Sequence, residues 1–186
     1  GYYHGYKGYR YFNRPSNTLN YKSFSELIAV YNFDSNIKAL FYPQVMKIET
    51  ALKGRILEEL VAETGSDDFS EIYHQLLNNY KSFSTKGKSY KDPKTKAKDE
   101  KEFKKALNKR LELRDRINKL QTTAYYHGNK IANHYLSEDQ SIPIWGIFEL
   151  LSLGEFGHFV SCLNKPCREK ISIKLGIQQS DDTNSM

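Results

Sequence analysis

The longest regular hydrophobic pattern in the chain lies between Asp34 and Glu63. Its apolar residues recur at spacings of three and four, which places them on one face of a helix with 3.6 residues per turn. They are Ile37, Leu40, Phe41, Val45, Ile48, Leu52, Ile56, Leu60 and Val61. The pattern predicts a core-facing helix of about 45 Å, on which the other helices pack. Pro43 lacks a backbone donor and its ring crowds the carbonyl of Ala39, so we expect a kink there or two helices that meet end to end.

Shorter helical patterns lie on both sides of this segment. One short helix is predicted within residues 16–32, before the long helix begins. Gly65 is expected to end the long helix, because a glycine readily adopts the left-handed conformation of a C-terminal stop. Asp67 or Ser70 is expected to start the next helix as its N-cap.

A second long helical pattern runs from Glu100 to Tyr135, with Gly128 marking a bend or an end. Apolar residues form its inner face, and Lys, Arg, Glu and Asp crowd the other faces. Such a stretch is suited to a helix that protrudes from the body or forms a two-helix hairpin. With the first long helix, it predicts an all-α bundle that has a long kinked central helix and a protruding charged helical segment.

The last third of the chain predicts three more helices. In the apolar stretch Ser141–Phe159, Gly154 is expected to end a first helix and Gly157 to permit close packing. A final helix is predicted over Lys165–Leu175, closed by Gly176. We therefore expect a single helical domain over residues 1–177, followed by a polar, disordered tail at 178–186.

The formal net charge is +6, and its location is more informative than its size. Ten lysines and only four acidic residues lie between Lys81 and Lys105, so this segment accounts for the whole excess. Residues 82–99 have almost no apolar side chains and no periodicity, which predicts a flexible Lys-rich insert. Its lysines could hold an RNA backbone through charge, although a solvated insert remains the alternative. The candidate RNA contacts in it are Lys86, Lys88 and Lys91.

Aromatic and cationic side chains alternate in the first fifteen residues, GYYHGYKGYRYFNRP. Five Tyr and one Phe could stack bases while Arg10 holds a phosphate. The alternative is a strand or bent connector whose aromatic side chains fill the core. Lys53 and Arg55 are further candidate phosphate contacts, since they project from a rigid helix. Glu49 with Lys53 and Arg55 with Glu59 stand four apart, a spacing typical of helical ion pairs.

Several classes of protein are disfavoured by the sequence. Cys162 and Cys167 are the only cysteines, too few for a disulfide framework, so a reducing cytoplasm is the simplest compartment. The most apolar run, 142–163, is interrupted by polar side chains, which argues against a membrane span; they are Glu149, Glu155 and His158. No Gly-rich phosphate loop, HExxH or GxSxG motif occurs, and we expect neither a cofactor nor a metal.

Three blocks of the chain resemble, in this order, the Abi-like family of bacterial abortive-infection proteins, of the AbiD/AbiF kind. The blocks are GYYHGYKGYRYF, YNFDSNIKALFYPQVMKIETALKGRI and IPIWGIFELLSLGEF. The last is the most specific and contains Pro143, Trp145, Glu149, Leu150, Ser152 and Gly154. The resemblance implies an all-helical HEPN-type domain, phage defence by growth arrest, and kinship with the HEPN ribonucleases of RNA-guided CRISPR systems.

HEPN ribonucleases carry an Arg and a His separated by four to six residues, usually paired across a dimer. The His would move a proton at the ribose 2′-hydroxyl or the leaving oxygen, and the Arg would stabilise charge on the phosphorus, without a metal. No Arg stands at this distance before any of the five His of this chain. The nearest imitation, Asn129–His134, has Asn in the Arg position. The resemblance places the motif downstream of the IPIW block, past Met186. Either the catalytic helix lies outside this sequence or the protein is not a nuclease of this type, and we assign no catalytic residue.

Two functions are consistent with these patterns. The first is the RNA-binding HEPN-type domain of a cytoplasmic, metal-independent endoribonuclease in phage defence, with RNA as partner. A homodimer, and an antitoxin or a phage-derived trigger, are further candidate partners. The alternative is a non-catalytic helical interaction or oligomerisation module, such as part of a toxin–antitoxin pair, which would use Glu100–Tyr135 as its partner surface.

Overall fold

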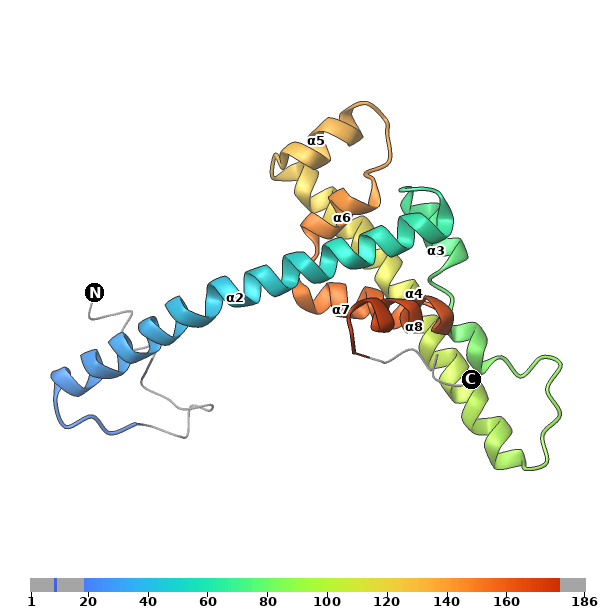
Figure 1. Cartoon of the computed structure of the whole chain (residues 1–186), viewed down its shortest axis with the longest axis horizontal. Helices are drawn as coiled ribbons and strands as arrows, with labels where there is room; N and C mark the ends of the chain where they lie inside the picture. Colours follow the sequence, from blue (N-terminus) through green and yellow to red (C-terminus); the bar gives the residue numbers. More distant parts are fainter. Residues whose placement is uncertain (1–8, 10–18, 178–186) are drawn as a thin grey trace, which may run out of the picture. The chain divides into compact units, whose positions relative to one another are not determined.

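A computed structural model describes Tyr9 and residues 19–177, and residues 19–177 form helices and connecting loops without a strand (Figure 1). The elements are α2 (Phe24–Thr64), α3 (Phe69–Gln75), the 3₁₀ helix η1 (Asn79–Phe83), α4 (Pro93–Tyr126), α5 (Lys130–Ser137), α6 (Ile144–Leu150), α7 (Leu153–Cys162) and α8 (Lys165–Lys174). The predicted all-α fold class is confirmed. The predictions for Arg10 and for the tail at 178–186 lie outside the described residues.

The chain divides into two compact units, residues 1–50 and 51–186. Helix α2 contributes its first half to one unit and its second half to the other. It runs through Pro43 as one helix, so the expected separate helix within 16–32 and the end-to-end junction are both wrong. Pro43 removes one backbone hydrogen bond from α2 without ending it, and the i, i+4 pair of Asp34 and Lys38, 2.6 Å apart, lies in the part of the helix before Pro43.

Glycines in the left-handed conformation follow three of the helices. Gly65, Gly128 and Gly176 have φ angles of 68°, 73° and 68° and lie just past α2, α4 and α8. These three stops agree with the sequence-based prediction. The start of α3 differs from it, because the N-cap is Asp68, whose side chain accepts a hydrogen bond from the Glu71 amide at 3.1 Å.

The hydrophobic core of the second unit is built around α4, which packs against η1, α5, α6 and α7. Leu113 and Ile117 of α4 are fully buried. The ring of Phe148 contacts those of Phe156 and Phe159 edge to face, each at 5.1 Å between centroids. The second half of α2 contributes to the same core, as do two free cysteines; these residues are Ile56, Leu60, Cys162 and Cys167.

The first half of the predicted apolar face of α2 is exposed, which corrects the expectation that it faces the core. The exposed side chains of this face are Ile37 (39%), Leu40 (68%), Phe41 (59%), Val45 (44%) and Ile48 (60%). Only the residues from Leu52 onward lie in or against the core. Hydrophobic periodicity shows which residues share a helix face, but it does not show what covers that face.

The junction of α6 and α7 lies earlier than predicted. Helix α6 ends at Leu150, and Gly154 lies inside α7 instead of ending a helix. Ser152 is the N-cap of α7 and forms a capping box with Glu155. The capping box therefore sets this boundary, and the glycine does not.

Close packing of a glycine occurs at Gly146, not at the predicted Gly157. A Cβ atom placed on Gly157 would meet nothing within 4 Å. A Cβ atom on Gly146 would lie 2.8 Å from Cγ2 of Ile142 and 3.0 Å from Cγ2 of Ile131. Helix α6 can therefore approach these two side chains only because residue 146 has none.

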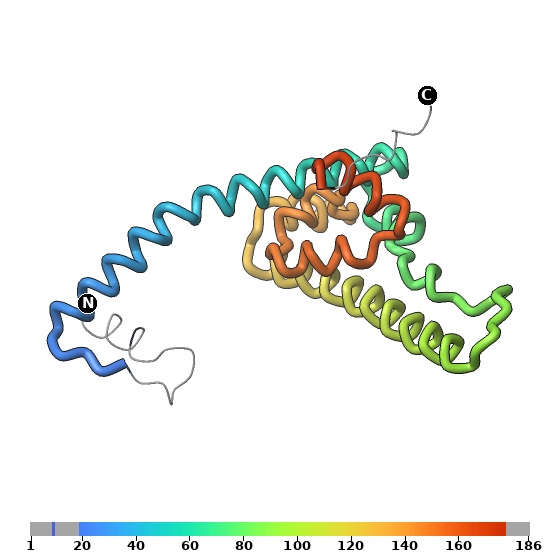
Figure 2. The backbone as a smooth tube through the Cα atoms, turned by 60° about the horizontal axis from the view of Figure 1, so that its bottom comes forward, coloured from blue at the N-terminus to red at the C-terminus, as the bar shows by residue number. Residues whose placement is uncertain are grey.

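The Lys-rich segment is a loop over part of its length only. Helix α4 begins at Pro93, so residues 93–99 of the predicted flexible insert are helical. Asp92 is the N-cap, with its side chain accepting from the Lys94 amide, and Pro93 occupies the first turn. This start signal overrides the low apolar content, and the loop that joins η1 to α4 spans residues 84–92 (Figure 2).

Candidate nucleic-acid interface

The loop of residues 84–92 is tied to α4 by contacts with Asp99. The Tyr90 hydroxyl donates to the Asp99 carboxylate at 2.7 Å, and this hydrogen bond raises the pKa of Tyr90 to about 12. Nζ of Lys88 donates to the Ser82 carbonyl at 3.1 Å and lies 3.8 Å from the Asp99 carboxylate. Lys86 and Lys91 are exposed on the same loop. The loop therefore presents cations at the start of α4 from a backbone that is held in place.

A cavity of about 230 Å³, the basic pocket, lies between η1, α4, α7 and α8. Three cationic side chains, Lys105, Lys109 and Arg168, line it, against one carboxylate, that of Glu102. Lys105 and Lys109 stand four apart on α4 and share one face of it. The pocket is therefore a concave site with excess positive charge, which suits a phosphate group.

The guanidinium of Arg168 is fixed at one wall of the basic pocket. Its Nη2 donates to Oδ1 of Asn79 at 2.9 Å, and Nδ2 of Asn79 donates to the Ser161 carbonyl at 3.3 Å. The partner of Arg168 is thus an amide, which leaves the positive charge without a neutralising carboxylate. A planar guanidinium in a set position binds phosphate oxygens at little entropic cost.

Arg110, which is near in sequence to Lys109, has a structural role. Its Nη2 donates to the Tyr73 carbonyl at 3.0 Å, and its guanidinium lies 3.8 Å from the centroid of the Tyr73 ring. This cation–π contact holds α4 to α3. We therefore do not count Arg110 among the cations available to a ligand.

The two predicted contacts on α2 have protein partners. Lys53 is half-buried, with its Nζ donating to the Leu151 carbonyl at 2.8 Å and lying 6.0 Å from the Phe156 ring. Arg55 is exposed and pairs with Glu58 at 3.3 Å. The predicted partner of Arg55, Glu59, is instead buried and pairs with Lys174 of α8. The structure therefore ties Lys53 to the end of α6, whereas Arg10 lies outside the described residues.

Sequence reasoning did not single out the residues that line the basic pocket. Lys105 and Lys109 carried a usable signal, since they stand four apart at the edge of the Lys-rich segment. Arg168 lies some sixty residues later in the chain, and only the packing of α8 beside η1 brings it to the same place. The predicted contacts Lys86, Lys88 and Lys91 lie on the loop that leads into α4.

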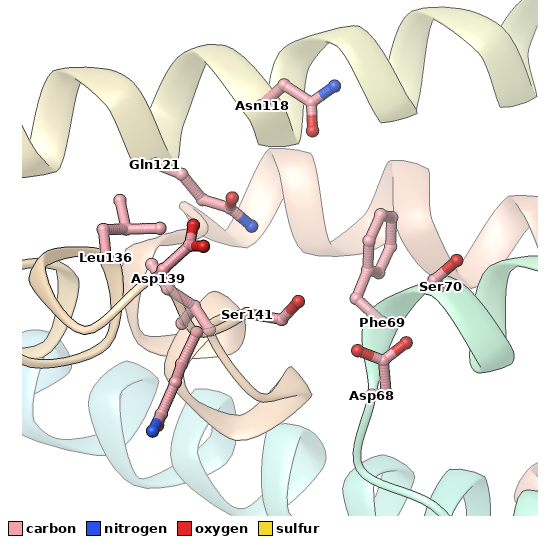
Figure 3. A pocket seen from close by; sticks show the side chains of 10 residues that line it. Asp68, Phe69, Ser70, Asn118, Gln121, Leu136, Asp139 and Ser141 are labelled. Atoms are coloured by element: carbon pink, nitrogen blue, oxygen red, sulfur yellow. The ribbon is translucent and has the colours of Figure 1, made fainter.

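A second cavity, of about 310 Å³, has the opposite electrostatic character (Figure 3). The carboxylates of Asp68 and Asp139 line it together with amide and hydroxyl groups, and no cationic side chain does. Asp139 has a φ angle of 54°, which is uncommon for a residue other than glycine. A cavity lined in this way repels a phosphate, so it is not the candidate interface.

A third cavity, of about 620 Å³, contains an ion pair between α4 and α7. Nε of Arg116 lies 2.6 Å from the Glu155 carboxylate, and the His158 ring lines the same cavity. Burial by itself raises the pKa of Glu155, but hydrogen bonds from Arg116 and Ser152 outweigh it and lower the pKa to about 2. The carboxylate thus neutralises Arg116, which leaves this cavity less suited to an anion than the basic pocket.

Of the two residues that imitate a HEPN motif, Asn129 caps a helix and His134 is exposed. Oδ1 of Asn129 accepts hydrogen bonds from the amides of Ile131 and Ala132, at 3.0 and 3.2 Å, and so caps α5. The His134 ring contacts that of Tyr135 edge to face at 4.9 Å. Within the described part of the chain, no group of three or more His, Cys, Asp or Glu side chains could hold a metal ion. No helix in residues 19–177 combines the length and hydropathy needed to cross a bilayer.

A family model described as "Abi-like protein" matches residues 1–186, the whole chain. The chain belongs to the Abi-like protein family. Membership of this family links it in general terms to abortive infection, a bacterial defence against phage. No curated protein and no solved structure matches the chain.

Proposed function

We propose that this Abi-like chain binds RNA through phosphate contacts during phage defence, and that the basic pocket and the loop of residues 84–92 form the contact surface. The observation that carries the proposal is the grouping of Lys105, Lys109 and Arg168 around one concave site. Contacts to phosphates position a protein on nucleic acid without reading its sequence. The expected binding is therefore electrostatic and largely independent of base sequence.

Charge distribution supports the same surface. The segment from Lys81 to Lys105 carries ten lysines and four acidic residues. It spans part of η1, the loop and the start of α4; η1 and α4 border the basic pocket, and the loop connects them. Such a patch raises the local concentration of a polyanion and accelerates its association. The exposed loop lysines would extend the phosphate contacts beyond the pocket.

The family resemblance implies a more specific function, endoribonuclease activity in a HEPN-type fold, which we include in this proposal. The described histidines lack an Arg at HEPN spacing, and Asn129 caps a helix. We therefore assign binding, and no catalytic step, to the residues of this chain. Cleavage of the HEPN type would require an Arg and a His at the motif spacing, which these residues do not provide.

Measuring RNA affinity across a salt series tests the proposal directly. Fluorescence anisotropy with a labelled single-stranded RNA of mixed sequence would give the slope of log affinity against log salt concentration. For single strands each phosphate contact contributes about −0.7 to this slope. The double variant Lys105→Ala/Lys109→Ala, which loses two contacts, should therefore make the slope shallower by about 1.4. The affinity of the double variant for RNA at low salt should also be lower than that of the wild type.

The matched control is the double variant Lys119→Ala/Lys130→Ala. Both lysines are exposed and lie outside the basic segment, and the loss of net charge is identical. The control should change the slope by much less than the pocket variant does. Absence of RNA binding at low salt, or equal effects of the two double variants, would overturn the proposal.

A second candidate function is an assembly module, which would act through a protein partner. The apolar face of the expected partner surface, Glu100–Tyr135, packs in the core, where Leu113, Ile117 and Ala132 are fully buried. The exposed large apolar side chains concentrate instead on the first half of α2. We infer that any assembly role belongs to α2.

A further inference from the structure

Helix α2 carries an apolar surface that the described chain leaves uncovered. Six side chains, the α2 stripe, lie within a face about 100° wide on a helix with 3.6 residues per turn. They are Val30 (37% exposed), Phe33 (66%), Ile37 (39%), Leu40 (68%), Phe41 (59%) and Ile48 (60%). Single exposed apolar residues are ordinary, whereas a contiguous group of this size marks an interaction surface.

The contacts described within the first unit use another side of α2. The Tyr9 hydroxyl donates to the Asp34 carboxylate, and the Tyr9 ring contacts that of Tyr31 edge to face at 6.0 Å. The Tyr21 hydroxyl donates to the Tyr9 carbonyl at 2.9 Å. Leu27 is buried in this unit, at 4% exposure. None of the six residues of the α2 stripe takes part in these contacts.

Two aromatic residues of the α2 stripe are placed symmetrically about Ile37. Phe33 and Phe41 stand four residues before and four residues after it. In an antiparallel pair of identical helices with a two-fold axis beside Ile37, each Ile37 therefore meets its copy, and Phe33 meets Phe41 of the other protomer. This arrangement buries the aromatic side chains against each other.

Charge complementarity favours the same axis. Glu26 stands eleven residues before Ile37 and Lys47 ten residues after it, so an antiparallel copy brings them opposite each other at both ends of the stripe. A parallel pair would instead place Glu26 against Glu26 and Lys47 against Lys47. Opposite charges at the rim of an apolar interface fix the register and the orientation of the two helices.

The area available is adequate for a specific dimer. At about 100 Å² of exposed surface per side chain, the stripe would bury about 600 Å² on each protomer and about 1,200 Å² in total. That total is at the lower end of specific interfaces between proteins. The stripe can therefore sustain an association of moderate strength without further contacts.

We propose that the α2 stripe is a homodimer interface in which α2 of two copies packs antiparallel around a two-fold axis beside Ile37. Glu26 of each protomer pairs with Lys47 of the other. Five of the apolar side chains lie between these pairs, and Ile48 lies level with Glu26 of the other protomer. This inference does not depend on RNA binding, because every residue it uses lies on the part of α2 that belongs to the first unit.

Sedimentation equilibrium of the full chain without RNA, over a range of protein concentrations, tests the interface. The wild-type chain should dimerise reversibly. Ile37→Glu places an unpaired charge at the axis and should weaken dimerisation by about 100-fold or more. The matched control, Asn32→Glu, adds the same charge on the same helix but about 140° around it from Ile37, and should leave the dimer intact.

A charge exchange tests the antiparallel orientation. Glu26→Lys and Lys47→Glu should each weaken the dimer, because each places like charges opposite one another. The double variant Glu26→Lys/Lys47→Glu should recover the affinity. Glu26 also accepts a hydrogen bond from the Lys22 amide at 2.8 Å, but this contact is lost in Glu26→Lys alone and in the double variant alike. Recovery in the double variant therefore reports the pairing between protomers.

Three results would overturn the proposal. A wild-type chain that stays monomeric at high concentration excludes the dimer, and protection of its stripe from solvent labelling would then indicate a cover from its own chain. A dimer unaffected by Ile37→Glu uses another surface. A charge-exchanged double variant no tighter than its two parents excludes the antiparallel axis.

Discussion

At the scale of single residues, Gly146 is the described glycine whose neighbours leave no room for a side chain. An alanine Cβ would lie 2.8 Å from Ile142 and 3.0 Å from Ile131, and both contacts involve stiff β-branched side chains. We expect Gly146→Ala to lower the free energy of unfolding by about 1–3 kcal/mol through overpacking. Urea denaturation followed by circular dichroism would measure this change.

Gly54→Ala provides the matched control for that measurement. Gly54 also lies inside a helix, but a Cβ atom there would meet nothing within 4 Å. The same substitution should therefore raise the free energy of unfolding by about 0.5–1 kcal/mol, since glycine costs a helix conformational entropy. Equal effects of the two variants would show that the packing around Gly146 is looser than described.

The Glu155 carboxylate should make stability depend on pH in the acidic range. Its pKa in the folded chain is about 2, against an ordinary value of 4.5. Because the folded state binds this proton more weakly than the unfolded state, the ionised carboxylate stabilises the fold above pH 4.5. That contribution is lost as the pH falls from 4.5 towards 2.

Comparison with Glu155→Gln isolates the contribution of this carboxylate. The difference in free energy of unfolding between wild type and variant should be constant near neutral pH and should shrink as the pH falls below 4.5. A difference that stays constant down to pH 2 would mean that the Arg116 and Ser152 hydrogen bonds do not lower the pKa. Denaturant titrations at a series of pH values would decide the matter.

At the scale of helices, side-chain caps fix where most elements begin. Asp68, Asp92, Asn129, Ser152 and Asn164 each accept a backbone hydrogen bond at a helix start. We expect Asn129→Ala to lower the free energy of unfolding by about 0.5–2 kcal/mol, whereas Asn129→Asp, which keeps the acceptor, should cost less. Thermal and urea denaturation would measure both variants.

RNA affinity distinguishes the cap from a functional role of Asn129. Because Asn129 caps α5 and does not line the basic pocket, Asn129→Ala should leave RNA affinity unchanged at temperatures where the variant is folded. A large loss of affinity in a folded variant would place Asn129 in the RNA contact surface and contradict its assignment as a purely structural cap.

Local signals in the sequence were sufficient to predict most of the helices and several of their ends. The sequence correctly predicts helix ends at Gly65 and Gly176, because a glycine in the left-handed conformation depends on few neighbours. The start of α4 at Pro93 was missed, since the low apolar content of the segment outweighed the Asp-Pro start signal. The prediction of close packing at Gly157 is wrong, because only tertiary packing determines which glycine lies against a neighbouring element.

The candidate site was less predictable than the helices. Lysines at the edge of the Lys-rich segment could be located by charge alone, and the basic pocket contains two of them. Arg168 reaches the pocket through the position of α8, which no local pattern encodes. Lys53 was expected at the surface, yet a long side chain at a half-buried position also finds backbone acceptors, and it donates to the Leu151 carbonyl.

At the scale of the whole molecule, α2 serves two units with one hydrophobic pattern. The pattern is continuous from Ile37 to Leu60, but Leu60 is fully buried whereas Ile37 is 39% exposed. Sequence periodicity treats both positions alike, since it describes the helix and not its surroundings. The exposed half of the pattern is therefore the feature that sequence reasoning could not distinguish from a core.

RNA binding and self-association should be separable, because they use different parts of the chain. Ile37→Glu should leave the affinity for a short RNA unchanged, although a long RNA that reaches both protomers should bind more weakly through lost avidity. Conversely, Lys105→Ala/Lys109→Ala should leave sedimentation without RNA unchanged. Anisotropy with short and long RNA would measure the first effect. Loss of short-RNA binding in Ile37→Glu would show that RNA binding depends on self-association or on the α2 stripe itself.

The buried cysteines give the second unit a built-in reporter of its own opening. Cys162 and Cys167 are both free and sequestered, and burial raises the pKa of the Cys167 thiol to about 11. At neutral pH a thiol reagent should thus modify Cys167 only when the surrounding helices separate. The rate at which a disulfide reagent reacts with the thiol and releases its coloured product would then measure how often these helices open, without any denaturant.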